Sequence, residues 1–178
     1  MGKKISRKQA LVNILAAVGS PILALPLFGL ANISKIGKPV YVRPIGNKDI
    51  KDPVTAITLG AGSRGNVYGN YAVEFPNELN IVGVAEPIEI RNERYSHKHN
   101  IPEKNRFDTW ERVFEQPKFA DAIIITTPDD LHYGPCMKAL KMGYDILLEK
   151  PIAPTEQECR DILELQKKNG NIVAVCHV

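Results

Sequence analysis

Five apolar runs, each about as long as a β-strand, alternate with stretches of helical pattern from Val54 onward. Few polar residues interrupt these runs, as expected for parallel strands that are buried on both faces. The runs predict strands at residues 54–59, 81–85, 122–126, 145–148 and 172–177, with a short additional strand at 106–107.

The intervals between the runs have helical patterns, at residues 66–75, 88–99, 110–114, 133–142 and 156–168. Strands that alternate with helices form a parallel sheet, because each helix returns the chain to the start of the next strand by a right-handed crossover. The last helix has the clearest limits, since Thr155 and Glu158 form a capping box and Gly170 tolerates a left-handed ending. The pattern predicts an α/β fold with a doubly wound parallel sheet.

A glycine-rich motif, Gly60-Ala61-Gly62-Ser63-Arg64-Gly65, lies between the first predicted strand and the first predicted helix. In such a motif the first glycine permits a tight turn, the second lets the backbone approach a diphosphate, and the third lets helix and strand pack closely. The helix N-terminus then offers N–H groups and the positive end of its dipole to the phosphates. The motif predicts dinucleotide binding in a Rossmann fold, with a purely structural turn as the alternative.

Glu86 follows the second predicted strand, about as far from the glycines as the acid that binds the adenosine ribose. A carboxylate accepts a hydrogen bond from a ribose 2′-hydroxyl and repels a 2′-phosphate, so the sequence favours NAD over NADP. Arg64 and Arg91 could each compensate a phosphate, which keeps NADP as the weaker alternative. Glu86 could also be a helix N-cap or first-turn acid ahead of Pro87, which is compatible with ribose binding.

The start of the chain has the order of an export signal, with Lys3, Lys4, Arg7 and Lys8 ahead of an apolar run at residues 10–31. The run is long enough to span a bilayer, but Pro21 and Pro26 would weaken a transmembrane helix. A cleavable signal, a retained membrane anchor and a buried core helix are the three interpretations. We expect export to the periplasm, by the general secretory route or by a twin-arginine-like signal in which Lys8 replaces the second arginine.

Three segments follow from these patterns: a signal or anchor at residues 1–31, a linker or arm at 32–53, and an NAD(P)-binding Rossmann domain at 54–178. The net charge of +3 arises in the leader, because outside its four cations 19 basic residues stand against 20 acidic ones. A nearly neutral domain argues against a nucleic-acid partner. Membrane contact is expected only through an uncleaved leader.

Two further motifs follow later strands. The segment Thr127-Pro128-Asp129-Asp130-Leu131-His132 is similar to the Thr-Pro-Asn-x-x-His turn of the Gfo/Idh/MocA oxidoreductase family, with Asp129 in place of asparagine. The segment Glu149-Lys150-Pro151 matches that family's Glu-Lys-Pro signature, in register after a predicted strand. From about Val54 to Val178 the chain therefore resembles the N-terminal Rossmann domain of this family.

The resemblance implies an NAD-dependent oxidoreductase that moves hydride between a sugar hydroxyl or carbonyl and nicotinamide. Lys150 is the candidate catalytic residue, because the family's lysine points towards the nicotinamide ribose and the substrate hydroxyl. Such a lysine lies where open parallel sheets bind ligands and can donate to an alkoxide-like oxygen, whereas the alternative is a surface Lys-Pro turn. The candidate cofactor-binding residues are Gly60, Gly62, Ser63, Arg64, Gly65, Glu86, Thr127, Pro128, His132, Glu149 and Lys150.

The roles of several polar residues stay open. Glu149 either orients Lys150 or faces solvent, and His132 either contacts the cofactor or caps the following helix. His177 could reach the same sheet edge or be a buried strand residue, so it is left unassigned. No metal site is expected, because His97 and His99 lie two residues apart on a predicted helix and point to different faces.

The family carries its acid/base residues and most sugar contacts in a second, open-faced sheet domain. We therefore expect nucleotide binding by this chain, and turnover only by a longer protein that also has the substrate domain. The family often forms homo-oligomers through that second domain, so such assembly is an expectation for the longer protein alone. Two alternatives remain. One is an NAD-dependent glycosidase that oxidises a sugar transiently to release an aglycone while its bound cofactor is recycled, and the other is a non-catalytic nucleotide-binding or interaction module.

Overall fold

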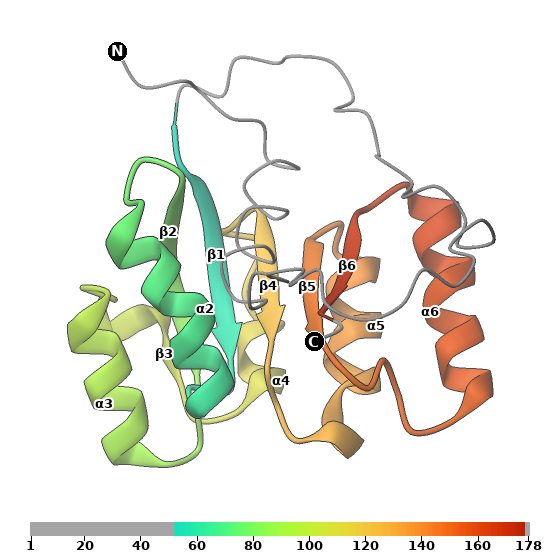
Figure 1. Ribbon diagram of the computed structural model, residues 1–178, viewed down its shortest axis with the longest axis horizontal. Coiled ribbons are helices and arrows are strands. Elements are labelled where there is room, and N and C mark those ends of the chain that lie inside the picture. The colour runs from blue at the N-terminus through green and yellow to red at the C-terminus, as the bar shows by residue number, and fades with distance from the viewer. Residues whose placement is uncertain (1–51, 177–178) are drawn as a thin grey trace, which may run out of the picture.

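The computed structural model describes residues 52–176 (Figure 1). The predicted export signal or anchor, nearly all of the predicted linker, and His177 lie outside these residues, so the expectations about them stay predictions. Within the described range, no helix is both long enough and apolar enough to cross a membrane.

A single six-stranded sheet forms the centre of the domain, in the order β3-β2-β1-β4-β5-β6. All five neighbouring pairs of strands are parallel. The strand order reverses between β1 and β4, where open parallel sheets bind their ligands. This arrangement confirms the predicted doubly wound Rossmann fold. The strands are β1 (Val54–Leu59), β2 (Leu79–Ala85), β3 (Arg106–Phe107), β4 (Ala122–Ile125), β5 (Asp145–Glu149) and β6 (Val173–Cys176).

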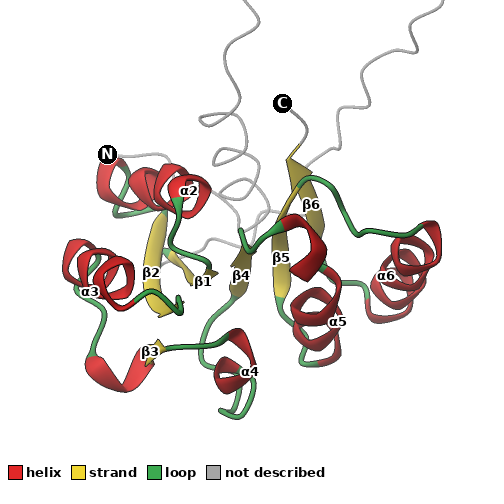
Figure 2. Ribbon diagram, turned by 90° about the horizontal axis from the view of Figure 1, so that it is seen from below, coloured by secondary structure: helices red, strands yellow, loops and turns green. Residues whose placement is uncertain are grey.

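Helices lie on both faces of the sheet (Figure 2). Side chains of α2 and α3 join one apolar core, and side chains of α4, α5 and α6 join the other. The central strand β4 serves both, since Ala122 and Ile124 belong to the first core while Ile123 and Ile125 belong to the second. Strands buried in this way favour apolar residues on both faces, which explains why few polar residues interrupt their runs. The helices are α2 (Ser63–Glu74), α3 (Glu89–Lys98), α4 (Trp110–Val113), α5 (Tyr133–Lys141) and α6 (Glu156–Asn169), with short 3-10 turns η1 (Glu103–Asn105) and η2 (Asp129–Leu131).

Most predicted limits agree with the structure to within one or two residues, and β1 and β3 agree at both ends. The predicted start of the first helix at residue 66 was wrong, because α2 begins at Ser63, inside the glycine motif. The predicted limits of α6 are confirmed by the capping box of Thr155 and Glu158 and by Gly170 at φ 74°.

His99, which ends α3, makes the stability of the domain depend on pH. Burial and the nearby Lys98 cation lower the pKa of His99 from 6.5 to about 4, and its Nε2 has no hydrogen-bond partner among the described residues. The unfolded chain therefore binds more protons than the folded chain between these two pH values, so stability falls as pH drops from about 6.5 towards 4.

We expect urea unfolding to show about 1 kcal/mol less stability at pH 5 than at pH 7 from this residue alone, after allowing for its partial exposure to solvent. The His99→Gln variant isolates that contribution, because every other titrating group is shared with the wild type. An equal pH dependence in both proteins would contradict the assignment to His99.

Candidate functional site

The turn after β1 requires glycine at its first motif position. Gly60 has a φ of 92°, and a Cβ there would lie 2.6 Å from the carbonyl oxygen of Thr126. The Thr126 hydroxyl donates to the Gly60 carbonyl oxygen at 2.6 Å and lies 3.1 Å from that of Leu59. The residue that follows β4 thus stabilises the glycine turn after β1.

The other two motif glycines differ in what surrounds them. A Cβ on Gly65 would lie 2.1 Å from the carbonyl oxygen of Gly60, so α2 packs on the turn as the motif predicts. A Cβ on Gly62 would meet nothing within 4 Å, and Gly62 has a negative φ. The fold itself therefore gives no steric reason for glycine at residue 62, and the open space lies at the N-terminus of α2.

The N-terminus of α2 fits an anionic group. Gly62 is the N-cap residue, no side chain caps the helix, and its first turn, which contains Ser63, holds no acidic residue. The first N–H groups of a helix have no partner within the helix, and the helix dipole favours negative charge there. An open space beside these donors matches the diphosphate of a dinucleotide.

Glu86 lies at the carboxyl end of β2 and is 5% exposed. Its carboxylate accepts hydrogen bonds from the backbone N–H of Ala61 at 2.7 Å and of Ile88 at 3.0 Å. The suggestion that Glu86 is itself a helix N-cap was wrong, because the N-cap of α3 is Ile88. A carboxylate has about four acceptor positions, so two bonds leave capacity for a ribose hydroxyl.

Glu149 ends β5 and is buried, so the alternative that it faces solvent was wrong. Its Oε1 accepts hydrogen bonds from Arg64 Nε at 2.6 Å and from the Tyr68 hydroxyl at 2.7 Å. Its Oε2 accepts from the backbone N–H of Lys150 at 3.0 Å. Burial alone would raise the pKa of Glu149, but the hydrogen bonds from Tyr68 and Lys150 and the charge of Arg64 together lower it.

Lys150 follows at the same sheet edge with an exposed side chain. Among residues 52–176 its ammonium has no hydrogen-bond or ion-pair partner, which leaves it available to a ligand. The peptide bond between Lys150 and Pro151 is cis.

Of the two roles predicted for His132, the structure bears on the helix cap, and contact with the cofactor stays a prediction. The residue stands at the N-cap of α5, but its side chain makes no cap hydrogen bond. Its ring is fully buried, with Nδ1 2.6 Å from the carbonyl oxygen of Pro151 and Nε2 3.0 Å from that of Thr127. His132 therefore joins the loop after β4, where Pro128 precedes η2, to the loop after β5.

Sequence reasoning missed two residues of this region, Tyr68 and Thr126. Tyr68 lies four residues after Arg64 on α2, a spacing that places both on one face of a helix, so its link to Arg64 could have been noticed. The hydroxyl of Thr126 acts across the sheet on a residue 66 positions away, and no local pattern indicates such a contact.

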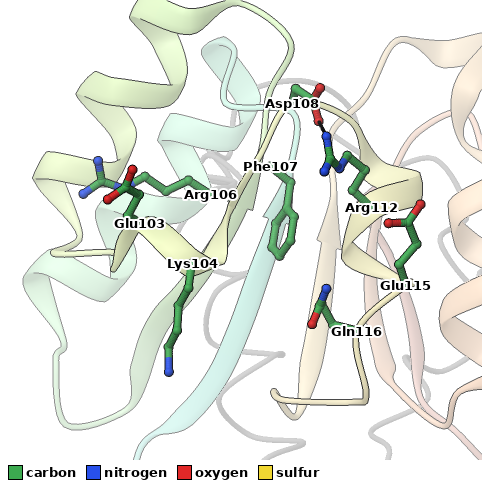
Figure 3. Close-up of a pocket in the computed structure, with 8 residues that line it drawn as sticks. All are labelled: Glu103, Lys104, Arg106, Phe107, Asp108, Arg112, Glu115 and Gln116. Atoms are coloured by element: carbon green, nitrogen blue, oxygen red, sulfur yellow. Dashed lines mark ion pairs between the residues drawn. The ribbon is translucent and has the colours of Figure 1, made fainter.

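A separate pocket of about 450 Å³ lies beside β3 and α4 (Figure 3). It is lined by charged residues of both signs, including Lys104, Arg106 and Glu115, and Asp108 pairs with Arg112 at its rim. None of the predicted cofactor-binding residues lines it, so we assign it no part in the site.

Comparisons with known proteins agree with this geometry. A sequence profile of an oxidoreductase family with an NAD-binding Rossmann fold matches residues 55–177. The scyllo-inositol 2-dehydrogenase (NAD(+)) of Bacillus subtilis is 32% identical over 122 residues, which are 68% of this chain and 35% of that relative.

Two solved structures share the fold at lower identity. The inositol dehydrogenase homolog of Azotobacter vinelandii, complexed with NADH and myo-inositol, superposes with a TM-score of 0.61 at 21% identity, covering 70% of this chain and 35% of that one. The WlbA dehydrogenase of Bordetella pertussis, in complex with NADH and UDP-GlcNAcA, has a TM-score of 0.61 at 16% identity, with 72% and 36% covered. The match spans about a third of the length of these proteins.

Proposed function

Because the chain belongs to the Gfo/Idh/MocA oxidoreductase family, with an NAD-binding Rossmann fold, we propose that it supplies the nucleotide-binding half of an enzyme that oxidises or reduces a cyclic polyol or sugar. The main support is the exposed Lys150, which has no hydrogen-bond or ion-pair partner among residues 52–176 and lies at the same sheet edge as the open space above Gly62. A dinucleotide bound along that edge places its two ends beside Glu86 and Lys150.

Each residue has a distinct role in this proposal. The N–H groups at the start of α2 bind the diphosphate, and Glu86 accepts hydrogen bonds from the adenosine ribose. Bound NAD supplies the hydride acceptor or donor. Lys150 donates a hydrogen bond to the substrate oxygen and stabilises the negative charge that develops on it during hydride transfer.

The substrate class is inferred from relatives. The matched enzyme of Bacillus subtilis is named for scyllo-inositol, and the Azotobacter vinelandii structure holds myo-inositol. Both compounds are rings with secondary hydroxyls, which is the group that this proposal assigns to Lys150. We therefore propose cyclitols as the first candidate substrates and sugars as the second. The test is to mix the whole protein with NAD and a panel of cyclitols and sugars, and to follow the absorbance of NADH.

The preference for NAD is tested by titrating the chain with NAD and NADP in a calorimeter. We expect the wild type to prefer NAD, and Glu86→Gln to reduce that preference roughly tenfold, because the variant loses both the charged acceptor for the 2′-hydroxyl and the repulsion of a 2′-phosphate. Glu89→Gln, three residues later at the exposed start of α3, removes the same charge without facing the ribose and is the control. Equal affinity of the wild type for both cofactors would rule out the role given to Glu86.

A further inference from the structure

Glu149 connects the helix that follows the glycine motif to the turn that carries Lys150. Its carboxylate accepts hydrogen bonds from Arg64 and Tyr68 of α2, and from the backbone N–H of Lys150 in its own turn. Arg64 uses only its Nε in this contact, and its side chain is 39% exposed. An arginine has five N–H donors, so the four on its terminal nitrogens are not engaged by this contact.

The strand order fixes which half of a bound dinucleotide Arg64 can serve. Glu86 follows β2 and Glu149 ends β5, and β1 and β4 separate these strands. Neighbouring strands lie about 4.8 Å apart, so the ends of β2 and β5 are roughly 14 Å apart. Arg64, held on Glu149, is therefore directed away from the adenosine ribose beside Glu86.

From this geometry, and resting on the proposed function, we propose that Arg64 binds the phosphate on the nicotinamide side of NAD and that Glu149 is the residue that positions it. Tyr68 supports the arrangement by holding the same carboxylate oxygen. Arg64 also neutralises Glu149, which removes a negative charge that would otherwise repel the diphosphate. In this proposal Arg64 does not compensate a 2′-phosphate, because that phosphate belongs to the adenosine half of NADP.

Fragments of the cofactor test the assignment without any substrate. The full chain and its Arg64→Gln variant are titrated with NAD, with ADP-ribose, which keeps both phosphates, and with AMP, which lacks the nicotinamide-side phosphate. We expect Arg64→Gln to lower the affinity for NAD and for ADP-ribose roughly tenfold each, and to leave the affinity for AMP within about twofold of the wild-type value. Arg160→Gln is the matched control, since Arg160 pairs with Glu156 on the surface of α6.

The positioning role of Glu149 is tested by a double-mutant cycle on NAD affinity. Glu149→Gln is expected to lower NAD affinity when it is made in the wild type. It should have no further effect in the Arg64→Gln background, because Glu149 acts through Arg64. Far-UV circular dichroism and thermal unfolding of each variant identify any loss of fold. Additive losses in the cycle would overturn the positioning role.

Other outcomes separate this proposal from the proposed function. Equal losses of affinity for NAD, ADP-ribose and AMP would show that Arg64 and Glu149 only support the fold. A loss of affinity for NAD alone would place Arg64 on the nicotinamide ring instead of the phosphate. Either result overturns this proposal and leaves the proposed binding of NAD intact. A folded wild type that binds none of the three ligands would overturn NAD binding itself, and this proposal with it.

Discussion

Replacement of Gly62 with valine is expected to lower NAD affinity by at least about a hundredfold while the domain stays folded. A Cβ on Gly62 meets nothing within 4 Å, so the new side chain leaves the backbone into open space. That space lies where a diphosphate approaches the first N–H groups of α2, and a branched side chain fills it. The weaker N-cap preference of valine costs about 1 kcal/mol of stability.

Calorimetric titration with NAD measures the first effect, and urea unfolding measures the second. Gly62→Ala adds one carbon at the same place and should show an intermediate loss of affinity. Unchanged NAD affinity in a folded Gly62→Val protein would mean that the cofactor does not approach this part of the loop, and the site would have to be placed elsewhere.

Replacement of Gly65 with alanine is expected to affect the stability of the fold. We expect a loss of at least about 3 kcal/mol in the free energy of unfolding. The new Cβ would lie 2.1 Å from the carbonyl oxygen of Gly60 and 3.0 Å from the Thr126 hydroxyl oxygen. The nearest of these atoms is backbone, so relief requires α2 to move away from β1. That movement disturbs the packing of Tyr68 and Ala72, which are both buried.

Urea unfolding curves of Gly65→Ala and Gly62→Ala form a matched pair, since each adds one methyl group to the same motif. We expect the midpoint to fall sharply for residue 65 and very little for residue 62. Similar midpoints would show that the close packing of helix on strand does not depend on the third glycine, contrary to the geometry.

The strands were predictable because burial on both faces leaves a simple signal in the sequence. Ile123, Ile124 and Ile125 alternate between the two cores and are apolar for that reason alone. The start of α2 was missed for the converse reason. Its first turn holds Ser63, Arg64 and Gly65, which are polar or small, so no apolar periodicity marks a helix there.

The candidate site also has residues that the sequence could predict and contacts that it could not. Glu86 and Lys150 could be predicted because each follows a recognisable strand at the edge where ligands bind. The pairing of Arg64 with Glu149 could not, since 85 positions separate the two residues and only the strand order brings them together. His132 illustrates the limit most clearly, because its motif indicated the right loop but gave no sign of the carbonyl groups on either side of its ring.

The position of His132 has a thermodynamic consequence for ligand association. Its ring lies within hydrogen-bond distance of the carbonyl oxygens of Thr127 and Pro151, and the contact with Pro151 joins the loop after β4 to the loop after β5 within the folded domain. The conformational entropy needed to order these loops is lost when the chain folds, before any ligand arrives. A ligand that binds between them therefore meets an ordered surface and keeps more of its interaction energy as affinity.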